Sequence, residues 1–207
     1  FARAQAIRSA VEANAESGLN NSVLFECFNG RRGGDNVEPL YQALRTQLPD
    51  WDFYWSNSQK RFAAPDGAAS VTPGSSEYIQ ALFRSRILVN NAEFPAYYRK
   101  QPGQLYVQTW HGTPLKKIGN DIHSAGISAQ YRAKMRRETR YWDVLLAQSD
   151  FAAEKFASAF SSSASVITDG YPRNDVLADA GEYARVRGET RNQLGIGEDE
   201  VFVLYAP

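Results

Sequence analysis

The sequence predicts an α/β protein with a mainly parallel sheet flanked by helices. Short apolar runs alternate along the chain with longer stretches of helical composition, which is the pattern of successive βαβ units. Hydrophobic residues make up 43% of the 207 residues and charged residues 22%, so the chain can bury a core of ordinary size. This length fits one large domain or two small ones.

Apolar residues at helical spacing, together with capping residues, predict the helices. Ile7 and Val11 lie one turn apart in the first helix. Asp35 and Glu38 are spaced as a capping box before the second, and Ser75 or Ser76 is a candidate N-cap for the third. In chain order, the predicted helices cover residues 3–16, a segment behind Asp35 that reaches Leu48, and residues 75–84, 130–141, 151–160 and 181–194.

Apolar runs that end at turn residues predict the strands. Residues 60–74 are rich in Ala, Ser, Pro and Gly and are predicted to form a loop. In chain order, the predicted strands cover residues 22–28, 51–55, 86–89, 104–109, 143–147, 165–168 and 201–204.

The composition near the C-terminus predicts a domain boundary. Residues 1–195 form the main predicted domain, with residues 1–18 as a leading helix, and residues 195–200 have the composition of a linker. An apolar run over 201–204 follows this linker. We therefore expect the chain to be a piece of a longer protein, in which residues 196–207 lead into a further domain.

Composition excludes several classes of protein. Lys+Arg and Asp+Glu balance at 23 each, so no overall positive field favours nucleic acid. The single cysteine, Cys27, excludes an intramolecular disulfide and a cysteine-rich zinc site, and it favours a reducing, cytoplasmic setting. No apolar run approaches the roughly 20 residues that span a bilayer, and no carboxylate cluster predicts a metal site. We predict neither a metal nor a cofactor.

The segment Trp110-His111-Gly112-Thr113-Pro114-Leu115-Lys116-Lys117 is the strongest functional candidate. It follows a predicted strand, so the His111 imidazole is expected at the carboxyl end of a parallel sheet, where ligands bind. Thr113 and Pro114 are typical of a helix start, whose free N–H groups would favour an anion. We predict a phosphate bound by Gly112, Thr113, Lys116 and Lys117, with neutral His111 accepting a proton. The structural alternative is a core histidine with solvated lysines.

This segment resembles the hallmark of the CDP-glycerol glycerophosphotransferases, the teichoic acid primases and polymerases of Gram-positive bacteria. The resemblance covers roughly residues 22–207. Its further motifs, in family order, are Leu24-Phe25-Glu26 with Phe28-Asn29-Gly30, Asp35-Asn36, Asn90-Asn91, Gly170-Tyr171-Pro172-Arg173-Asn174-Asp175 and Leu204-Tyr205-Ala206-Pro207. The basic loop Arg31–Gly34 and His123 depart from the family pattern.

The resemblance implies a GT-B architecture, in which two Rossmann-like domains face each other across a cleft. This chain would be the N-terminal, acceptor-side half, and His111 the general base. The donor, CDP-glycerol, would be held mainly by a C-terminal domain that begins within residues 196–207. The reaction would transfer glycerol phosphate to a lipid-linked glycerol-phosphate acceptor and release CMP. The fragment alone would be inactive, and the enzyme would lie peripherally at the inner face of the plasma membrane.

Two further groups are candidate phosphate ligands. Asn29, Gly30, Arg31 and Arg32 follow the first strand and can approach an acceptor phosphate, or they form a tight turn with solvated arginines. Arg173 follows a later strand and is a candidate for the interdomain cleft.

The cationic segment Arg132–Arg140 is a candidate membrane-surface helix. Glu138 interrupts it, and a solvated helix face is the preferred interpretation. For the whole protein, the alternatives are a related GT-B transferase that uses CDP-ribitol or a nucleotide sugar, and a non-catalytic module that binds an anionic polymer.

Overall fold

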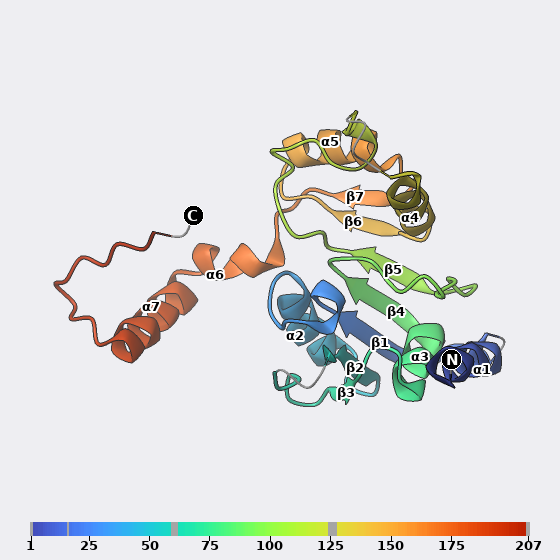
Figure 1. Ribbon diagram of the computed structural model, residues 1–207. Helices are drawn as coiled ribbons and strands as arrows, with labels where there is room; N and C mark the ends of the chain where they lie inside the picture. Colours follow the sequence, from blue (N-terminus) through green and yellow to red (C-terminus); the bar gives the residue numbers. More distant parts are fainter. Residues whose placement is uncertain (1, 16, 59–61, 124–127, 206–207) are drawn as a thin grey trace. The chain divides into compact units, whose positions relative to one another are not determined.

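The computed structural model describes residues 2–15, 17–58, 62–123 and 128–205. Within these ranges seven strands form one sheet, in the order β3-β2-β1-β4-β5-β6-β7 (Figure 1). Every neighbouring pair is parallel, which confirms the predicted fold class. The strands are β1 (Asn20–Glu26), β2 (Asp52–Ser56), β3 (Ala69–Val71), β4 (Ser85–Asn90), β5 (Leu105–Gln108), β6 (Val144–Leu146) and β7 (Ser165–Ile167).

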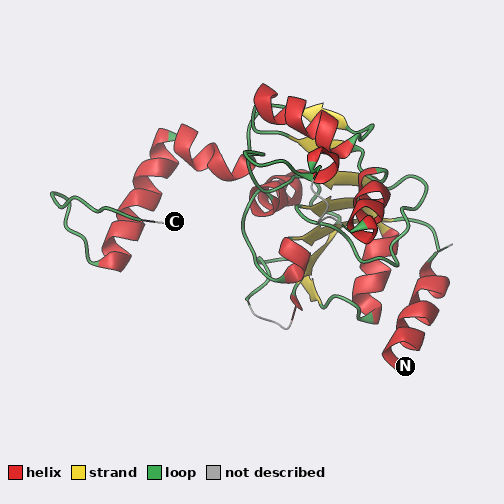
Figure 2. Ribbon diagram, turned by 45° about the horizontal axis from the view of Figure 1, so that its top comes forward, coloured by secondary structure: helices red, strands yellow, loops and turns green. Residues whose placement is uncertain are grey.

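Helices connect most of these strands and cover the sheet (Figure 2). Serine N-caps begin three of them: Ser75, Ser128 and Ser149 each accept a hydrogen bond from the backbone N–H three residues on. The helices are α1 (Ala2–Asn14), α2 (Val37–Gln47), α3 (Ser76–Arg84), α4 (Ala129–Thr139), α5 (Asp150–Phe160), α6 (Asp175–Ala178) and α7 (Ala180–Leu194), with short 3₁₀ turns η1 (Phe28–Gly30), η3 (Gly119–Asp121) and η4 (Pro172–Asn174).

Alternate residues of the central strands supply two separate cores. Leu24 and Leu88 belong to the core that also contains side chains of α3, α4 and α5. Val23 and Val89, their neighbours in sequence, belong to the core that contains α2. Because successive side chains of a strand point to opposite faces, helices cover the sheet on both sides.

The strand order reverses direction between β1 and β4. From β1 the chain proceeds outward to β2 and β3, and from β4 it proceeds the other way to β7. Loops that leave β1 and β4 therefore diverge at the carboxyl edge of the sheet. Open α/β sheets bind their ligands at such a switch point.

Three local predictions were wrong. The segment 60–74 contains strand β3, whose Ala69 pairs with Tyr54 of β2; residues 60 and 61 lie outside the described residues. Asp35 does not cap α2, because its φ of 55° turns the chain and its carboxylate binds elsewhere. Residues 201–204 pair with no strand in the described ranges, and their side chains are exposed, so the backbone groups there lack the partners that a strand requires.

The chain divides into two compact units, residues 1–173 and residues 174–207. The second unit contains α6 and α7, which pack on each other. The assignment of residues 196–207 to a further domain stays a prediction, and residues 206 and 207 of its last motif lie outside the described residues. No helix in the described ranges is long and apolar enough to cross a membrane.

Two carboxyl groups are buried within the first unit. Glu26 accepts hydrogen bonds from the hydroxyls of Ser56 (2.7 Å) and Tyr78 (2.8 Å), and Glu138 accepts one from Tyr106 (2.6 Å). Burial raises the pKa of each carboxyl from 4.5 to about 7, because a charged group loses its hydration there. Near neutral pH both groups titrate in the folded protein.

A side chain at Gly119 should destabilise the fold. Gly119 has a φ of 52°, and a Cβ atom there would lie 2.2 Å from the backbone oxygen of Ala159 in α5. We expect Gly119→Ala to lower the free energy of unfolding by roughly 3 kcal/mol through overpacking and backbone strain, as measured by urea denaturation. Gly188→Ala is the control, because a Cβ there meets no atom within 4 Å. Equal stabilities of the two variants would contradict this packing.

The buried carboxyl of Glu26 should make stability depend on pH. Its pKa is about 7 in the folded protein against 4.5 ordinarily, so the folded state keeps a proton that the unfolded chain releases. Stability is therefore lost as pH rises from 4.5 to 7, and the loss persists above pH 7. Glu26→Gln removes this charge and should raise the free energy of unfolding at pH 8 by on the order of 3 kcal/mol, with little change at pH 4.

The exposed Glu12 of α1 provides the matched control. Glu12→Gln should leave stability close to that of the parent protein at both pH values. A Glu26→Gln variant whose stability difference is the same at pH 4 and pH 8 would show that folding does not raise the pKa of Glu26.

Candidate active site

His111 is held at the carboxyl edge of the sheet, beside the switch point. Its Nδ1 lies 2.6 Å from the backbone oxygen of Asn91, which follows β4. A carbonyl oxygen only accepts hydrogen bonds, so Nδ1 carries the proton and Nε2 keeps its lone pair in the neutral ring. No described residue hydrogen-bonds to Nε2. The half-buried imidazole is thus oriented through one nitrogen and available as a base through the other.

Aromatic rings fix the plane of the imidazole. Trp110 stacks on it with ring centroids 4.4 Å apart, and Phe28, from the loop after β1, lies 5.5 Å away. Trp110 in turn packs against Phe156 and Phe160 of α5. The histidine therefore has little rotational freedom.

The side chain of Asn91 joins the loops around His111. Its Oδ1 accepts from the Phe28 N–H (2.8 Å), and its Nδ2 donates to Asp35 Oδ2 (2.9 Å). The neighbouring Asn36 donates to the backbone oxygens of Thr109 and Trp110 at 3.5 Å. Residues distant in sequence thus hold the segments after β1, β4 and β5 together.

Arg173 completes this network. Its guanidinium is 2.6 Å from Asp35 Oδ1 and donates to the His111 backbone oxygen at 3.2 Å. It also lies over the Tyr171 ring, whose hydroxyl donates to the Gly112 oxygen at 3.4 Å. Arg173 therefore lies beside His111, and its charge is paired with that of Asp35. Its role as a phosphate ligand stays a prediction.

Left-handed backbone conformations concentrate at this edge. Phe28, Asn29, Asp35 and Trp110 all have φ between 46° and 59°. Such conformations cost non-glycine residues free energy and collect at functional sites. Four left-handed residues in the loops around one imidazole indicate that these loops are shaped for a function as well as for folding.

The predicted helix start at Thr113 was wrong. Residues 113–118 form no helix, and the Thr113 hydroxyl accepts a hydrogen bond from Gln148 Nε2 at 2.6 Å. The next helical turn is η3, whose N-cap residue, Ile118, makes no side-chain hydrogen bond. Because residues 113–118 begin no helix, this segment supplies no helix N-terminus beside His111, and phosphate binding by Gly112 and Thr113 stays a prediction.

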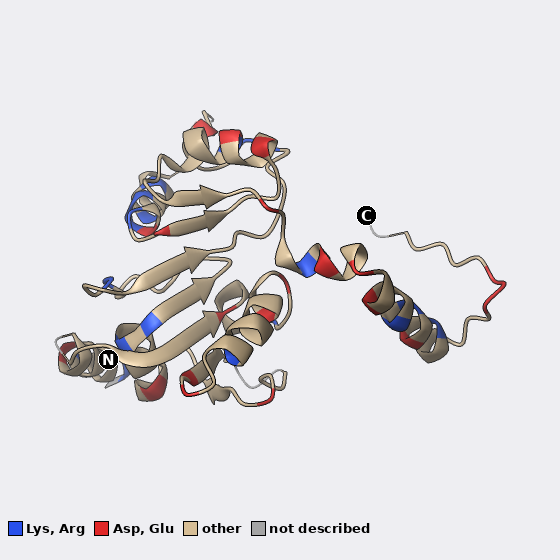
Figure 3. Ribbon diagram, turned by 180° about the vertical axis from the view of Figure 1, so that it is seen from behind, with Lys and Arg blue, Asp and Glu red and all other residues tan. Residues whose placement is uncertain are grey.

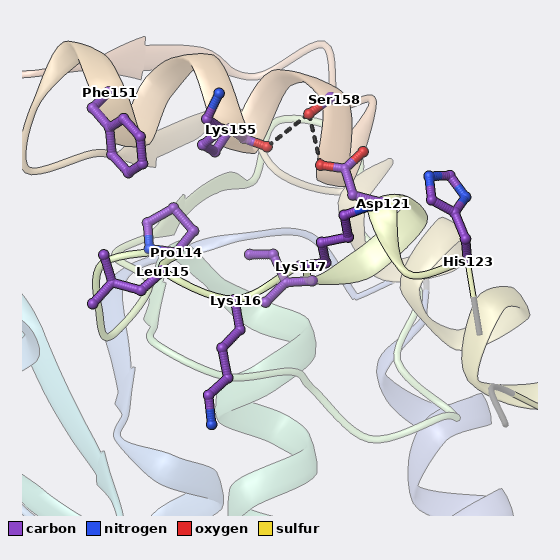
Figure 4. A pocket seen from close by; sticks show the side chains of 10 residues that line it. Pro114, Leu115, Lys116, Lys117, Asp121, His123, Phe151, Lys155 and Ser158 are labelled. Atoms are coloured by element: carbon purple, nitrogen blue, oxygen red, sulfur yellow. Dashed lines mark hydrogen bonds between the residues drawn. The ribbon is translucent and has the colours of Figure 1, made fainter.

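Lys116 and Lys117 line a different cavity from the His111 network. This cavity has a volume of about 430 Å³, and Phe151 and Lys155 of α5 also line it. In Figure 4 the amine of Lys116 extends away from α5, so the cations of this cavity do not converge on one point. The His123 side chain also borders it. Phosphate binding by these lysines stays a prediction.

The residues of the loop after β1 differ in burial and in their contacts. Gly30 is buried with a φ of 71°, and a Cβ there would lie 2.7 Å from Ser56 Oγ, so packing within the protein requires this glycine. Arg31 and Arg32 are exposed, with Arg32 over the Phe28 ring at 5.7 Å. Asn29 donates to the Glu93 backbone oxygen at 3.2 Å. This loop binds neighbouring loops, and its contact with phosphate stays a prediction.

Lys and Arg residues gather along α4 (Figure 3). Lys134 pairs with Glu93 at 3.1 Å, and Arg137 lies 3.8 Å from Glu138. Met135 of the same helix is buried in the core. These contacts fit the solvated helix face that the sequence favoured.

The Cys27 thiol does not provide a nucleophile for the site. Burial and the nearby Asp35 raise the pKa of the Cys27 thiol to about 12, so the thiol is neutral and a weak nucleophile. No group of three or more His, Cys, Asp and Glu side chains in the described ranges could hold a metal ion. The site therefore contains one imidazole base, His111, at the carboxyl edge of the sheet, with the cationic Arg173 beside it.

Sequence reasoning missed the partners that position His111. Asn91, Asp35, Asn36 and Tyr171 lay within motifs that matched the family, yet none was named as a site residue. The only available signal was their presence in those motifs, because their contacts with one another and with Arg173 span as many as 138 residues of sequence.

Curated relatives resemble this chain over most of its length. A teichoic acid poly(glycerol phosphate) polymerase of Staphylococcus epidermidis is 33% identical over 90% of this chain and 27% of that protein. The corresponding polymerase of Bacillus subtilis is 32% identical over 90% and 26%. A teichoic acid glycerol-phosphate transferase of Staphylococcus aureus is 32% identical over 90% and 50%. The chain thus spans between about a quarter and a half of these relatives.

Solved structures of a teichoic acid polymerase also resemble this chain. The wall teichoic acid polymerase TagF matches with a TM-score of 0.87 and 30% identity, over 96% of this chain and 50% of that chain. A TagF variant soaked with CDPG matches with a TM-score of 0.86. These matches confirm the predicted fold class over nearly the whole chain.

The family model of CDP-glycerol:poly(glycerophosphate) glycerophosphotransferases matches residues 12–207. With the relatives above, this match establishes that the chain belongs to the CDP-glycerol:poly(glycerophosphate) glycerophosphotransferase family.

Proposed function

We propose that the protein containing this chain transfers glycerol phosphate from CDP-glycerol to a lipid-linked glycerol-phosphate acceptor in the synthesis of teichoic acid or a related polymer. The observation that carries this proposal is the His111 imidazole, fixed through Nδ1 on the Asn91 carbonyl with Nε2 free of hydrogen bonds to the described residues. Family membership supplies the reaction class.

In the proposed reaction, a terminal hydroxyl of the acceptor attacks the β-phosphorus of CDP-glycerol. A new P–O bond forms, the bond to the α-phosphate oxygen breaks, and CMP leaves with that electron pair. The hydroxyl proton passes to His111 Nε2. Such general-base help contributes about 10²–10⁴-fold to a rate, and the rest comes from positioning and charge neutralisation.

The chain supplies the acceptor side of this reaction in the proposal. It spans 26% to 50% of the first relatives, and we infer that the CDP-glycerol site lies mainly in a C-terminal domain outside it. The fragment alone is then inactive. We infer from the lipid-linked acceptor that the enzyme acts in the cytoplasm, at the inner face of the plasma membrane.

Replacement of His111 tests the assignment. In the full-length protein, His111→Ala should lower the rate of CMP release from CDP-glycerol by at least about 100-fold, because the base is lost. His123→Ala, the chain's other histidine, is the matched control and should retain the rate. Near-normal turnover of the His111 variant would exclude the catalytic role.

Donor selection separates the alternative functions. A full-length protein that prefers CDP-ribitol or a nucleotide sugar is a related transferase with the same base. If none of these donors is turned over while anionic polymer still binds, the protein is a binding module, and the proposed function fails.

A further inference from the structure

A second cavity at the carboxyl edge of the sheet lies next to the His111 network. It has a volume of about 810 Å³ and is bordered by the end of β1, the loop after β4 and helix α4. Its lining mixes charged side chains with apolar ones such as Phe94, Pro95 and Tyr131. It belongs entirely to the first compact unit.

The loops that position His111 also build this cavity. Asn91 holds the imidazole, and two residues further along the same loop Glu93 lines the cavity wall. Phe28 contacts the imidazole, and the next residue, Asn29, lines the cavity. The Asn29 amide donates to the Glu93 backbone oxygen, which joins the two loops at the cavity. A ligand held there would lie against both loops that orient the base.

Polar groups with unused hydrogen-bonding capacity border the cavity. Both hydrogen bonds to Glu26 fall on Oε2, so Oε1 has no partner among the described residues. The Nε of Arg137 is buried without a partner. Lys134 pairs with Glu93, and its side chain remains 47% exposed. The Oε1 of Glu26 and the remaining N–H donors of the Lys134 ammonium group are therefore available to a ligand, and the Arg137 guanidinium lies at the same cavity wall.

These groups define a ligand chemistry. An anionic oxygen fits Lys134 and Arg137, and a hydroxyl fits a carboxyl that can both accept and donate. Burial raises the pKa of Glu26 to about 7, so the carboxyl is largely protonated just below neutral pH. Phe94 and Tyr131 offer apolar surface for carbon-bound hydrogens. A small molecule with hydroxyls and one phosphate meets all of these conditions.

We propose that this cavity binds a polyol phosphate, with the phosphate at Lys134 and Arg137 and a hydroxyl at Glu26. The inference rests on the proposed function in one respect, since it takes the polyol phosphate to be the terminal unit of the acceptor. That unit would then lie between α4 and the loops that hold His111.

Direct binding tests the cavity without requiring turnover. Glycerol 3-phosphate is titrated into the full-length protein by calorimetry, with Lys134→Ala as the test variant. We expect about tenfold weaker binding, since one charge-assisted hydrogen bond is lost. Arg136→Ala is the control, because Arg136 is exposed on the same helix and does not line the cavity. Lys134 is also exposed, so neither substitution threatens the fold.

Three results would overturn the inference. They are no binding of glycerol 3-phosphate, equal weakening by both variants, and binding of inorganic phosphate as tight as that of glycerol 3-phosphate. The last would indicate a simple anion site, because the hydroxyl contacts would contribute nothing.

Kinetics identifies the source of the polyol phosphate. In the full-length protein, Lys134→Ala should raise the KM for the lipid-linked acceptor about tenfold and leave the KM for CDP-glycerol unchanged. Free glycerol 3-phosphate should compete with the acceptor and not with CDP-glycerol. Competition with CDP-glycerol alone would place the ligand in the donor site and contradict the proposal.

The two proposals fail in different ways. If no donor is turned over but glycerol 3-phosphate still binds in a Lys134-dependent manner, the cavity inference stands and the proposed function fails. If transfer is normal and Lys134→Ala changes neither binding nor the KM for the acceptor, the function stands and the cavity inference fails.

Discussion

The hydrogen bond between His111 Nδ1 and the Asn91 carbonyl is the interaction on which the rest of this site depends. It joins the segments after β5 and β4, which the parallel sheet already brings side by side. By engaging one ring nitrogen it determines which nitrogen remains basic. Asn91 is itself held through its side chain to Phe28 and Asp35, so the tautomer of one histidine is coupled to three loops.

The same loops explain why this edge contains strained backbone. Four non-glycine residues adopt left-handed conformations there, and each requires compensating contacts. Stacking of Trp110 on His111 and the pairing of Asp35 with Arg173 supply such contacts. The ion pair also compensates the negative charge of Asp35 beside His111. Positioning and electrostatics at the site thus come from one network.

Much of the fold was predictable from sequence, since apolar runs and serine caps are local signals. The parallel sheet and the α3 cap at Ser75 follow from such patterns. Strand β3 was missed because three residues that pair with β2 carry almost no periodicity. Thr113-Pro114 has the composition of a helix start, but the hydrogen bond to Gln148 and the packing of Ile118 override it. Tertiary contacts decided each of these cases.

In the site, too, some residues were predictable from local sequence and others depend on tertiary contacts. His111 and Arg173 could be named as candidates from their own segments, whereas Asn91 and Asp35 act through contacts between distant residues. The cavity at Glu26 was beyond sequence reasoning, because burial of a carboxyl and the free Arg137 Nε are properties of packing.

Nitrogen NMR of histidine-labelled full-length protein at pH 8 distinguishes the two tautomers of the His111 imidazole. The His111 signals can be assigned by their loss in His111→Gln. We expect the signals to show a proton on Nδ1 and none on Nε2. A His111 protonated at Nε2 would contradict this expectation, because the bond to the Asn91 carbonyl would be absent and the proposed base would have no free lone pair at that nitrogen.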